Sequence, residues 1–346
     1  MRKILILTEG FTNPHTAKTA RNLLIYKPEE VVGLLDSAYT GENGCSLLET
    51  EGFSPVFSSV QDAPSADHLL IGIATPGGVL PENLRKHVTD AIKNRMNIIS
   101  GLHHYLSEDP EFVALAKEYG VALKDLRKNN FNKVVNRKGI NPASLRIQTV
   151  GNDCSLGKMV VSLNVTNYLL EKGLDAKFVA TGQTGMLISD GGLPVDNIKG
   201  DYINGAAEHL VLENQHHDLL MIEGQGSLVH PRYSSVTLGL LHGAQPHALI
   251  MCYELGREFI HGVEGFRIPD MDVVIDIYLK MANIMFPCEL IGFAINSRKK
   301  TVKEADIERK KMRERYGLPV CDVVRHGPEE LGDAVIEFNN RFRSSL

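Results

Sequence analysis

The sequence lacks the features of several classes of protein. Its apolar runs, such as Ile4–Leu7 and Leu219–Ile222, fall far short of the ~18–20 residues that a membrane-spanning helix needs. The N-terminal segment has no signal-peptide core, no CxxC pair occurs, and the five cysteines are widely spaced. These absences argue against an integral membrane protein, a disulfide-bonded secreted protein and a zinc ribbon. We therefore expect a cytoplasmic protein.

Positive charge is not in excess either. The 346 residues include 37 Lys and Arg against 42 Asp and Glu, a net charge of −5, whereas nucleic-acid-binding surfaces are basic. The hydrophobic content of 43% is enough to form cores, and the length suggests about two domains. We expect a small-molecule substrate, no nucleic-acid or membrane partner, and a homo-oligomer.

Short apolar segments alternate with helical segments along the whole chain, which predicts parallel sheets covered by helices. The expected fold class is α/β, with an N-terminal Rossmann-like domain over 1–130, a polar linker over 131–144 and a C-terminal P-loop NTPase-like domain over 145–346. The predicted strands are Lys3–Thr8, Val31–Leu35, Leu69–Ala74, Asn97–Ser100, Leu145–Val150, Ala176–Thr181, Leu219–Ile222, Ala248–Met251 and Glu289–Ile295.

The most specific motif lies between a predicted strand and a predicted helix. It resembles the P-loop pattern G-x-x-x-x-G-K-[ST], with one additional residue between its glycines. Backbone N–H groups, the helix N-terminus and a lysine together attract phosphate. We predict that phosphates of a nucleotide or of coenzyme A bind here. The predicted cofactor-binding residues are Gly151, Asn152, Asp153, Cys154, Ser155, Gly157 and Lys158, with Gln183 and Thr184 from the next strand end.

The residue after the P-loop lysine is Met159. P-loop NTPases use a Ser or Thr hydroxyl there to bind Mg²⁺, and methionine has no hard oxygen ligand. Either another group, such as Thr184 or Asp201, holds Mg²⁺, or the loop binds a phosphorylated cofactor without metal-dependent phosphoryl transfer. We predict no resident metal.

Four further residues near predicted strand ends are candidates for chemistry. Glu223 begins the sequence EGQGSL directly after a buried strand and is a candidate base, as is His242, which lies between glycines. His230 and Arg257 are candidates for substrate binding, because a guanidinium suits a carboxylate or phosphate. A purely structural role is equally plausible for either histidine. The glycine-rich segment Thr237–Gly243 is interpreted as another strand-end loop.

The P-loop resembles that of dethiobiotin synthetase and its relatives, whose loop reads G-T-D-T-x-x-G-K-T. The match covers Gly151, Asp153, Gly157 and Lys158, and it fails at Cys154 and Met159. This resemblance implies a similar P-loop fold and, as one alternative function, an ATP- and Mg²⁺-dependent enzyme that activates a carboxylate.

A wider resemblance covers nearly the whole chain. The chain is similar to a two-domain family, long described as a domain of unknown function, that joins a Rossmann-like domain to a P-loop domain and includes D-glutamate N-acetyltransferases. The motifs that carry it are His15–Arg21, Gly72–Pro81, Ile99–His103, Gly151–Lys158, Gly182–Gly185, Glu223–Leu228 and Thr237–Gly243.

This resemblance implies an N-acetyltransferase that moves acetyl from acetyl-CoA to the amine of a small (D-)amino acid such as D-glutamate. The alternatives are the ATP-dependent enzyme above and a nucleotide-binding regulatory protein without chemistry.

Overall fold

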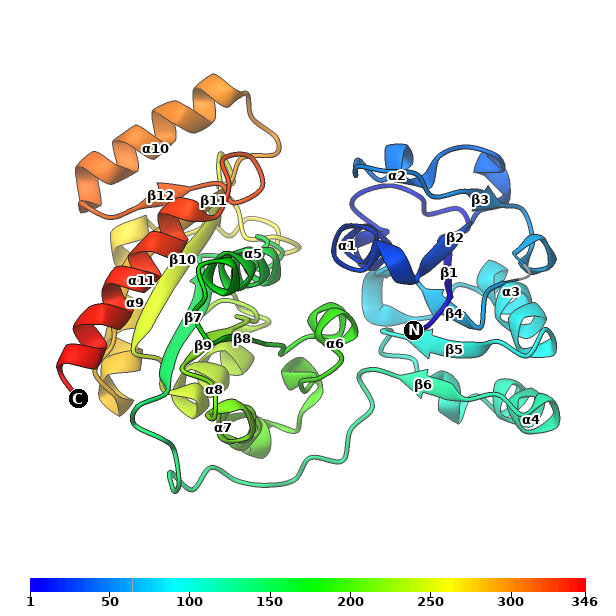
Figure 1. The fold of residues 1–346 in the computed structure, drawn as a ribbon, viewed down its shortest axis with the longest axis horizontal. Coiled ribbons are helices and arrows are strands. Elements are labelled where there is room, and N and C mark those ends of the chain that lie inside the picture. The colour runs from blue at the N-terminus through cyan, green and yellow to red at the C-terminus, as the bar shows by residue number, and fades with distance from the viewer. Residues whose placement is uncertain (64) are drawn as a thin grey trace. The chain divides into compact units, whose positions relative to one another are not determined.

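The computed structural model describes residues 1–63 and 65–346, which form two compact units. Unit 1 consists of Met1–Lys128 and Met186–Asp190, and unit 2 consists of Asn129–Gly185 and Gly191–Leu346. Each unit contains a six-stranded sheet whose neighbouring strands pair in parallel, with helices around it (Figure 1). The predicted α/β fold class is confirmed.

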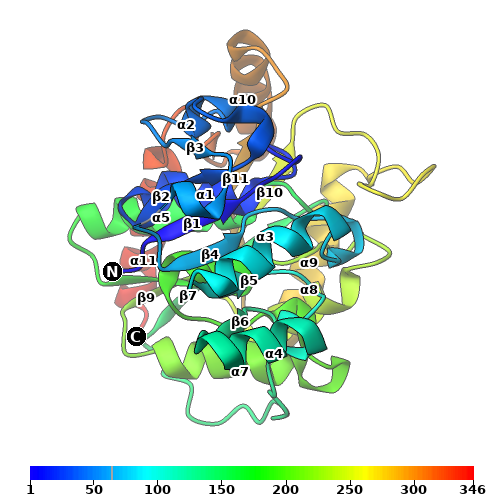
Figure 2. The same ribbon diagram turned by 90° about the vertical axis from the view of Figure 1, so that its right-hand side faces the viewer.

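In unit 1 the sheet order is β3-β2-β1-β4-β5-β6. All four residues of β1 are buried, as expected for a parallel strand covered on both faces. Helices α3 and α4 pack against each other beside this sheet (Figure 2). The strands are β1 (Ile4–Leu7), β2 (Val31–Leu35), β3 (Val56–Phe57), β4 (His68–Ile71), β5 (Asn97–Ser100) and β6 (Leu123–Asp125), and the helices are α1 (Lys18–Tyr26), α2 (Gly44–Leu47), α3 (Glu82–Lys93) and α4 (Pro110–Tyr119).

In unit 2 the sheet order is β12-β11-β10-β7-β9-β8, which places β7 at an interior position. The strands are β7 (Leu145–Gly151), β8 (Ala176–Val179), β9 (Leu219–Ile222), β10 (Ala248–Glu254), β11 (Glu289–Asn296) and β12 (Val320–Cys321). The helices are α5 (Lys158–Glu171), α7 (Ile203–Asn214), α8 (Ser234–Ala244), α9 (Met271–Met285), α10 (Val302–Tyr316) and α11 (Glu329–Ser344). A further helix, α6 (Gln183–Ser189), begins in unit 2, and its residues from Met186 onward belong to unit 1.

Alternate residues of the unit 2 strands point to opposite faces of the sheet, and each face has its own core. Leu219 and Met221 of β9 join a cluster formed with α5 and α11, whereas Leu220 and Ile222 join one formed with α7 and α8. α9 packs on the same face as α8, against β10 and β11. In the described part of the chain, no helix has the length and hydropathy that a membrane crossing requires.

The interpretation of Thr237–Gly243 as a strand-end loop was wrong, because this segment is part of α8. Its glycines are required by close packing on α7. A Cβ atom at Gly243 would lie 2.2 Å from the carbonyl oxygen of Asn204, and one at Gly239 would lie 2.4 Å from the side chain of Ile203. Glycine, usually unfavourable inside a helix, is therefore explained here by the approach of two helices.

Candidate functional site

The candidate site lies where β7, β8, β9 and β10 of unit 2 end, at one edge of the sheet. The P-loop connects β7 to α5 through Asn152–Gly157. Gly157 has φ of +100°, a conformation that favours glycine, and it immediately precedes Lys158, the first residue of α5. The first N–H groups of a helix have no acceptor within the helix, so this end of α5 suits an anion.

Lys158 lies across the P-loop. Its side chain is buried, and its Nζ donates a hydrogen bond of 2.8 Å to the carbonyl oxygen of Asp153. Burial lowers the pKa of this amine. Gly224 leaves space for the Lys158 side chain, because a Cβ atom at Gly224 would lie 3.0 Å from Lys158 Cδ and 1.8 Å from the carbonyl oxygen of Thr149.

Asn152 gives the P-loop an unused polar group. The residue is buried, yet its side-chain oxygen has no hydrogen-bond partner among the described residues. A buried acceptor without a partner costs free energy, and an N–H or O–H group of a bound ligand can complete it. Phosphate groups would instead be bound by Lys158 and the start of α5, which provide positive charge and N–H donors. Met159, half-buried at the next position, provides no oxygen ligand for Mg²⁺.

Asp153 fixes the P-loop to the segment that follows β10. Its carboxylate is fully buried and accepts hydrogen bonds from Arg257 Nη1 at 2.9 Å, the His261 N–H at 2.9 Å and the Cys154 N–H at 2.7 Å. Arg257 also donates to the Cys154 carbonyl oxygen and to Glu254 at the end of β10. The guanidinium predicted to bind substrate is thus largely occupied in holding the P-loop.

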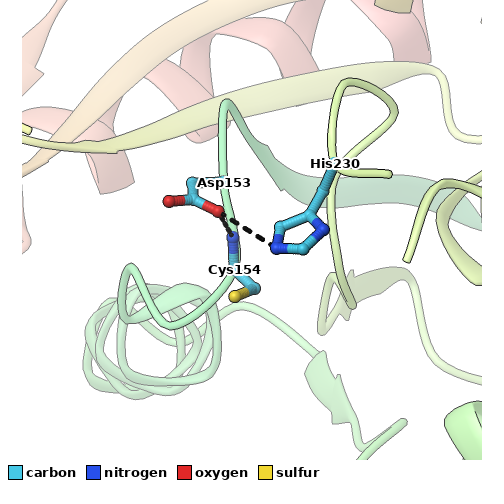
Figure 3. Close-up of side chains that lie close together, drawn as sticks. All are labelled: Asp153, Cys154 and His230. Atoms are coloured by element: carbon cyan, nitrogen blue, oxygen red, sulfur yellow. Dashed lines mark hydrogen bonds and ion pairs between the residues drawn. The ribbon is translucent and has the colours of Figure 1, made fainter. Parts of the chain in front are cut away.

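Asp153, Cys154 and His230 lie close together and offer three potential metal ligands within 4.8 Å of one another (Figure 3). The hydrogen bonds of His230 argue against a metal. Its Nδ1 accepts from the Arg232 N–H at 3.2 Å, so its Nε2 carries the proton and donates to the His261 carbonyl oxygen at 3.1 Å. Burial also raises the pKa of the Cys154 thiol, which disfavours the thiolate that binds metals. This donor set does not fit a metal ion.

His230 is also fully buried. Together with its two engaged ring nitrogens, this places it as a support between the Ser227–Tyr233 segment and the segment around His261. Its predicted role in direct substrate binding does not follow from this placement.

Glu223 is the carboxylate beside the P-loop. It follows β9, is 4% exposed, and its Oε2 accepts from the N–H groups of Thr181 at 2.9 Å and Gly182 at 3.1 Å. Gln225 Nε2 lies 3.2 Å from its Oε1. Burial raises the pKa of Glu223 to about 7, against the opposing effect of these N–H groups. A carboxyl group that titrates near neutral pH is suited to accept a proton from a substrate.

Other predicted residues are placed differently. Gln183 and Thr184 form the first turn of α6, next to Gly185, where a Cβ atom would lie 2.6 Å from Glu223 Oε2. Asp201 is exposed in the short turn Gly200–Tyr202.

The structure does not bring His242 to Glu223. Its Nε2 hydrogen-bonds the Met281 carbonyl oxygen at 3.0 Å, joining α8 to α9, and burial lowers its pKa. It lies more than one helical turn from Thr237, the α8 residue that contacts the Glu223 loop through the Gln225 carbonyl oxygen. We assign it to helix packing, which argues against the prediction that His242 is a candidate base.

Sequence reasoning missed Tyr278 of α9. Its buried hydroxyl donates to the Gly151 carbonyl oxygen at 2.9 Å and accepts from the Leu228 N–H at 3.1 Å, so it joins the start of the P-loop to the EGQGSL segment. No motif surrounds this tyrosine, and its role arises only from the packing of α9.

Fold and site together define a two-domain α/β protein with a P-loop domain. Residues 135–332 match the family model described as "Domain of unknown function (DUF1611_C) P-loop domain", and residues 38–129 match the one described as "Domain of unknown function (DUF1611_N) Rossmann-like domain". The chain belongs to the DUF1611 family, as its sequence motifs predicted.

Two curated relatives match almost all of the chain. A D-glutamate N-acetyltransferase from Pseudoalteromonas sp. is 34% identical over 94% of this chain and 96% of its own length. Another from Tritonibacter scottomollicae is 33% identical over 92% and 94%. The crystal structure of a DUF1611 family protein from Anabaena variabilis superposes with a TM-score of 0.90 at 30% identity, covering 97% of this chain and all of that one.

Proposed function

We propose that this protein is an N-acetyltransferase that moves the acetyl group of acetyl-CoA to the amine of a small amino acid such as D-glutamate. The observation that carries the proposal is the pairing of a P-loop that lacks the Mg²⁺-binding hydroxyl with a buried carboxyl at the neighbouring strand end. The names of its relatives support the same reaction.

The residues divide this reaction between binding and proton transfer. The start of α5 and Lys158 bind phosphate, which needs no metal at the position of Met159. An acetyl thioester supplies an electrophilic carbonyl carbon and a thiol leaving group. An amino acid reaches the site as an ammonium ion, which has no lone pair for attack. Glu223, with a pKa of about 7, accepts the ammonium proton and leaves a nucleophilic amine.

An acceptor with carboxylates also needs a cation. Because Arg257 is held by Asp153 and Glu254, Arg232 is the better choice. It is exposed and directly follows the His230-Pro231 pair. This assignment gives the substrate carboxylate a guanidinium that does not support the loop itself.

The test is an incubation of the purified full chain with acetyl-CoA and D-glutamate. Thiol release is measured colorimetrically and the acetylated product by mass spectrometry, with L-glutamate and no acceptor as parallel arms. A further arm contains ATP, Mg²⁺ and D-glutamate. We expect thiol release that requires the acceptor and yields N-acetylglutamate. Phosphate release in the ATP arm without acetyl transfer would favour carboxylate activation, and ATP binding without either reaction would favour a regulatory protein; both results overturn the proposal.

A further inference from the structure

Three cations meet on one carboxylate beside the P-loop. Glu254, 3% exposed by its side chain, ends β10 and accepts from Arg257 at 2.7 Å, Lys299 at 2.8 Å and Arg298 at 3.3 Å. One negative charge cannot neutralise three positive charges, and Arg257 already has Asp153 as a second partner. Arg298 and Lys299 therefore share the negative charge of Glu254 that Arg257 does not neutralise. The three cations together with Asp153 and Glu254 keep a net positive charge.

These two cations have donors available for a ligand. Their side chains are 40% and 58% exposed, whereas that of Arg257 is only 10% exposed. A guanidinium has five N–H donors and an ammonium three, more than Glu254 can accept. Surface lysines usually face solvent without a ligand, but this pair is held in place by a buried carboxylate, which limits the entropy lost on binding.

The loop that carries them, residues 297–300, is held by hydrogen bonds to the segment that follows β12. Ser297 donates from both its N–H and its hydroxyl to Asp322 Oδ2, at 2.9 and 2.6 Å, and is fully buried. Arg325 donates to the carbonyl oxygens of Ser297 and Lys300. A Cβ atom at Gly256 would lie 2.8 Å from Lys300 Cε, so the segments after β10 and β11 approach closely.

The same loop is tied to the P-loop. Asn296, the last residue of β11, donates from Nδ2 to the Leu156 carbonyl oxygen at 3.1 Å. Arg257 connects from the other side through the Cys154 carbonyl oxygen at 2.8 Å. The P-loop and the cationic pair are thus neighbouring features of one strand edge, and both suit an anion.

A ligand that uses both features must carry anionic groups in two places, and phosphate is one such group. The phosphates of ATP form one chain, which a P-loop binds by itself. Coenzyme A has a diphosphate and, separately, a phosphomonoester on its ribose. We infer that Arg298 and Lys299 form a subsite for this ribose 3′-phosphate, an inference that rests on the proposed use of acetyl-CoA. It goes beyond that proposal because it predicts that the protein distinguishes CoA from nucleotides, such as ATP, that have no phosphate apart from their phosphate chain.

The test is calorimetric titration of the full chain with acetyl-CoA and with its 3′-dephospho analogue. The variant is Arg298→Ala/Lys299→Ala. The matched control is Lys310→Ala/Lys311→Ala, which removes two exposed positive charges from α10, away from this loop. Adenosine 3′,5′-bisphosphate, as a competitor, separates phosphate recognition from contacts with the rest of CoA.

We expect the wild-type chain and the control to bind acetyl-CoA about tenfold or more tightly than the dephospho analogue. The Arg298→Ala/Lys299→Ala variant should bind both ligands equally, at the affinity of the wild-type chain for the dephospho analogue. Equal binding of the two ligands by the wild-type chain overturns the subsite and leaves the proposed function intact. Loss of preference in the control shows a general charge effect and also overturns the subsite. No binding of acetyl-CoA at all contradicts the proposed function itself.

Discussion

The two units have the same kind of sheet, but the polar side chains at their strand ends differ in charge and in whether their hydrogen bonds are already made within the chain. In unit 1 the buried carboxylate of Asp36 follows β2 and accepts from the Gly10 N–H, the Thr12 hydroxyl and the Ala38 N–H. Nearby Glu9 accepts from the Ser37 N–H. These acids are used to close the turns of their own chain.

In unit 2 the strand ends carry cations and an unfilled acceptor. Lys158 is buried in the P-loop, Arg257 is clamped beside it, and Asn152 has an oxygen without a partner among the described residues. A Rossmann-like sheet with an acid after its second strand is often associated with a nucleotide ribose. Here Asp36 is buried and already accepts three hydrogen bonds from its own turns, so we propose phosphate binding for unit 2 rather than for unit 1.

The largest expected effect is that of Glu223→Gln on acetyl transfer. The amide keeps the shape of the side chain but cannot accept the ammonium proton, so we expect kcat to fall by about 10²–10⁴-fold. Steady-state assays of thiol release measure this loss, and calorimetry should show acetyl-CoA affinity within about twofold of wild type, since phosphates are bound elsewhere. An equal loss of affinity would mean that Glu223 supports binding rather than proton transfer.

Lys158→Met should have the next largest effect. The substitution keeps much of the volume and removes the charge that faces phosphate, so acetyl-CoA affinity should fall by about 30–100-fold, the loss of a charged hydrogen bond. Calorimetry measures it, with a thermal melt to establish that the variant is folded. Because a buried amine is replaced by an apolar group, the free protein should melt no lower than wild type. Unchanged affinity would place the phosphates away from this loop.

The fold and the P-loop could be predicted because their signals are local. A glycine-rich segment between an apolar strand and a helix is contiguous, and alternating elements predict parallel sheets. The roles of His230 and Arg257 could not be predicted, because residue type does not show that their polar atoms are occupied by His261, Asp153 and Glu254. The same applies to α8. Its glycines are typical of a loop in the sequence, and only the structure shows that they allow close packing on α7.

The pH dependence of stability offers a smaller effect on the same carboxyl group. The pKa of Glu223 is raised from 4.5 to about 7 in the folded state, so the folded chain holds this proton more tightly than the unfolded chain. Stability is then lost as the pH rises from about 5 to 8 and the buried group becomes charged, by up to about 3 kcal/mol.

Glu223→Gln removes this titration. The difference in melting temperature, variant minus wild type, should therefore increase from pH 5 to pH 8, even though the variant is expected to be a much slower enzyme. Thermal melts at both pH values measure the difference. A constant difference across this range would show that the carboxyl group does not titrate there.

The smallest effect tests unit 1. Asp36→Asn leaves one oxygen to accept hydrogen bonds but turns an amide N–H₂ toward either Ala38 or the Gly10–Thr12 turn, so a buried donor loses its acceptor. We expect a loss of about 1–3 kcal/mol in the free energy of unfolding, measured by urea denaturation, with acetyl-CoA affinity unchanged. This outcome would separate the two strand ends, one structural and one ligand-binding. If affinity instead fell with little change in stability, Asp36 would have to contact the ligand, and the contrast between the two units would no longer hold.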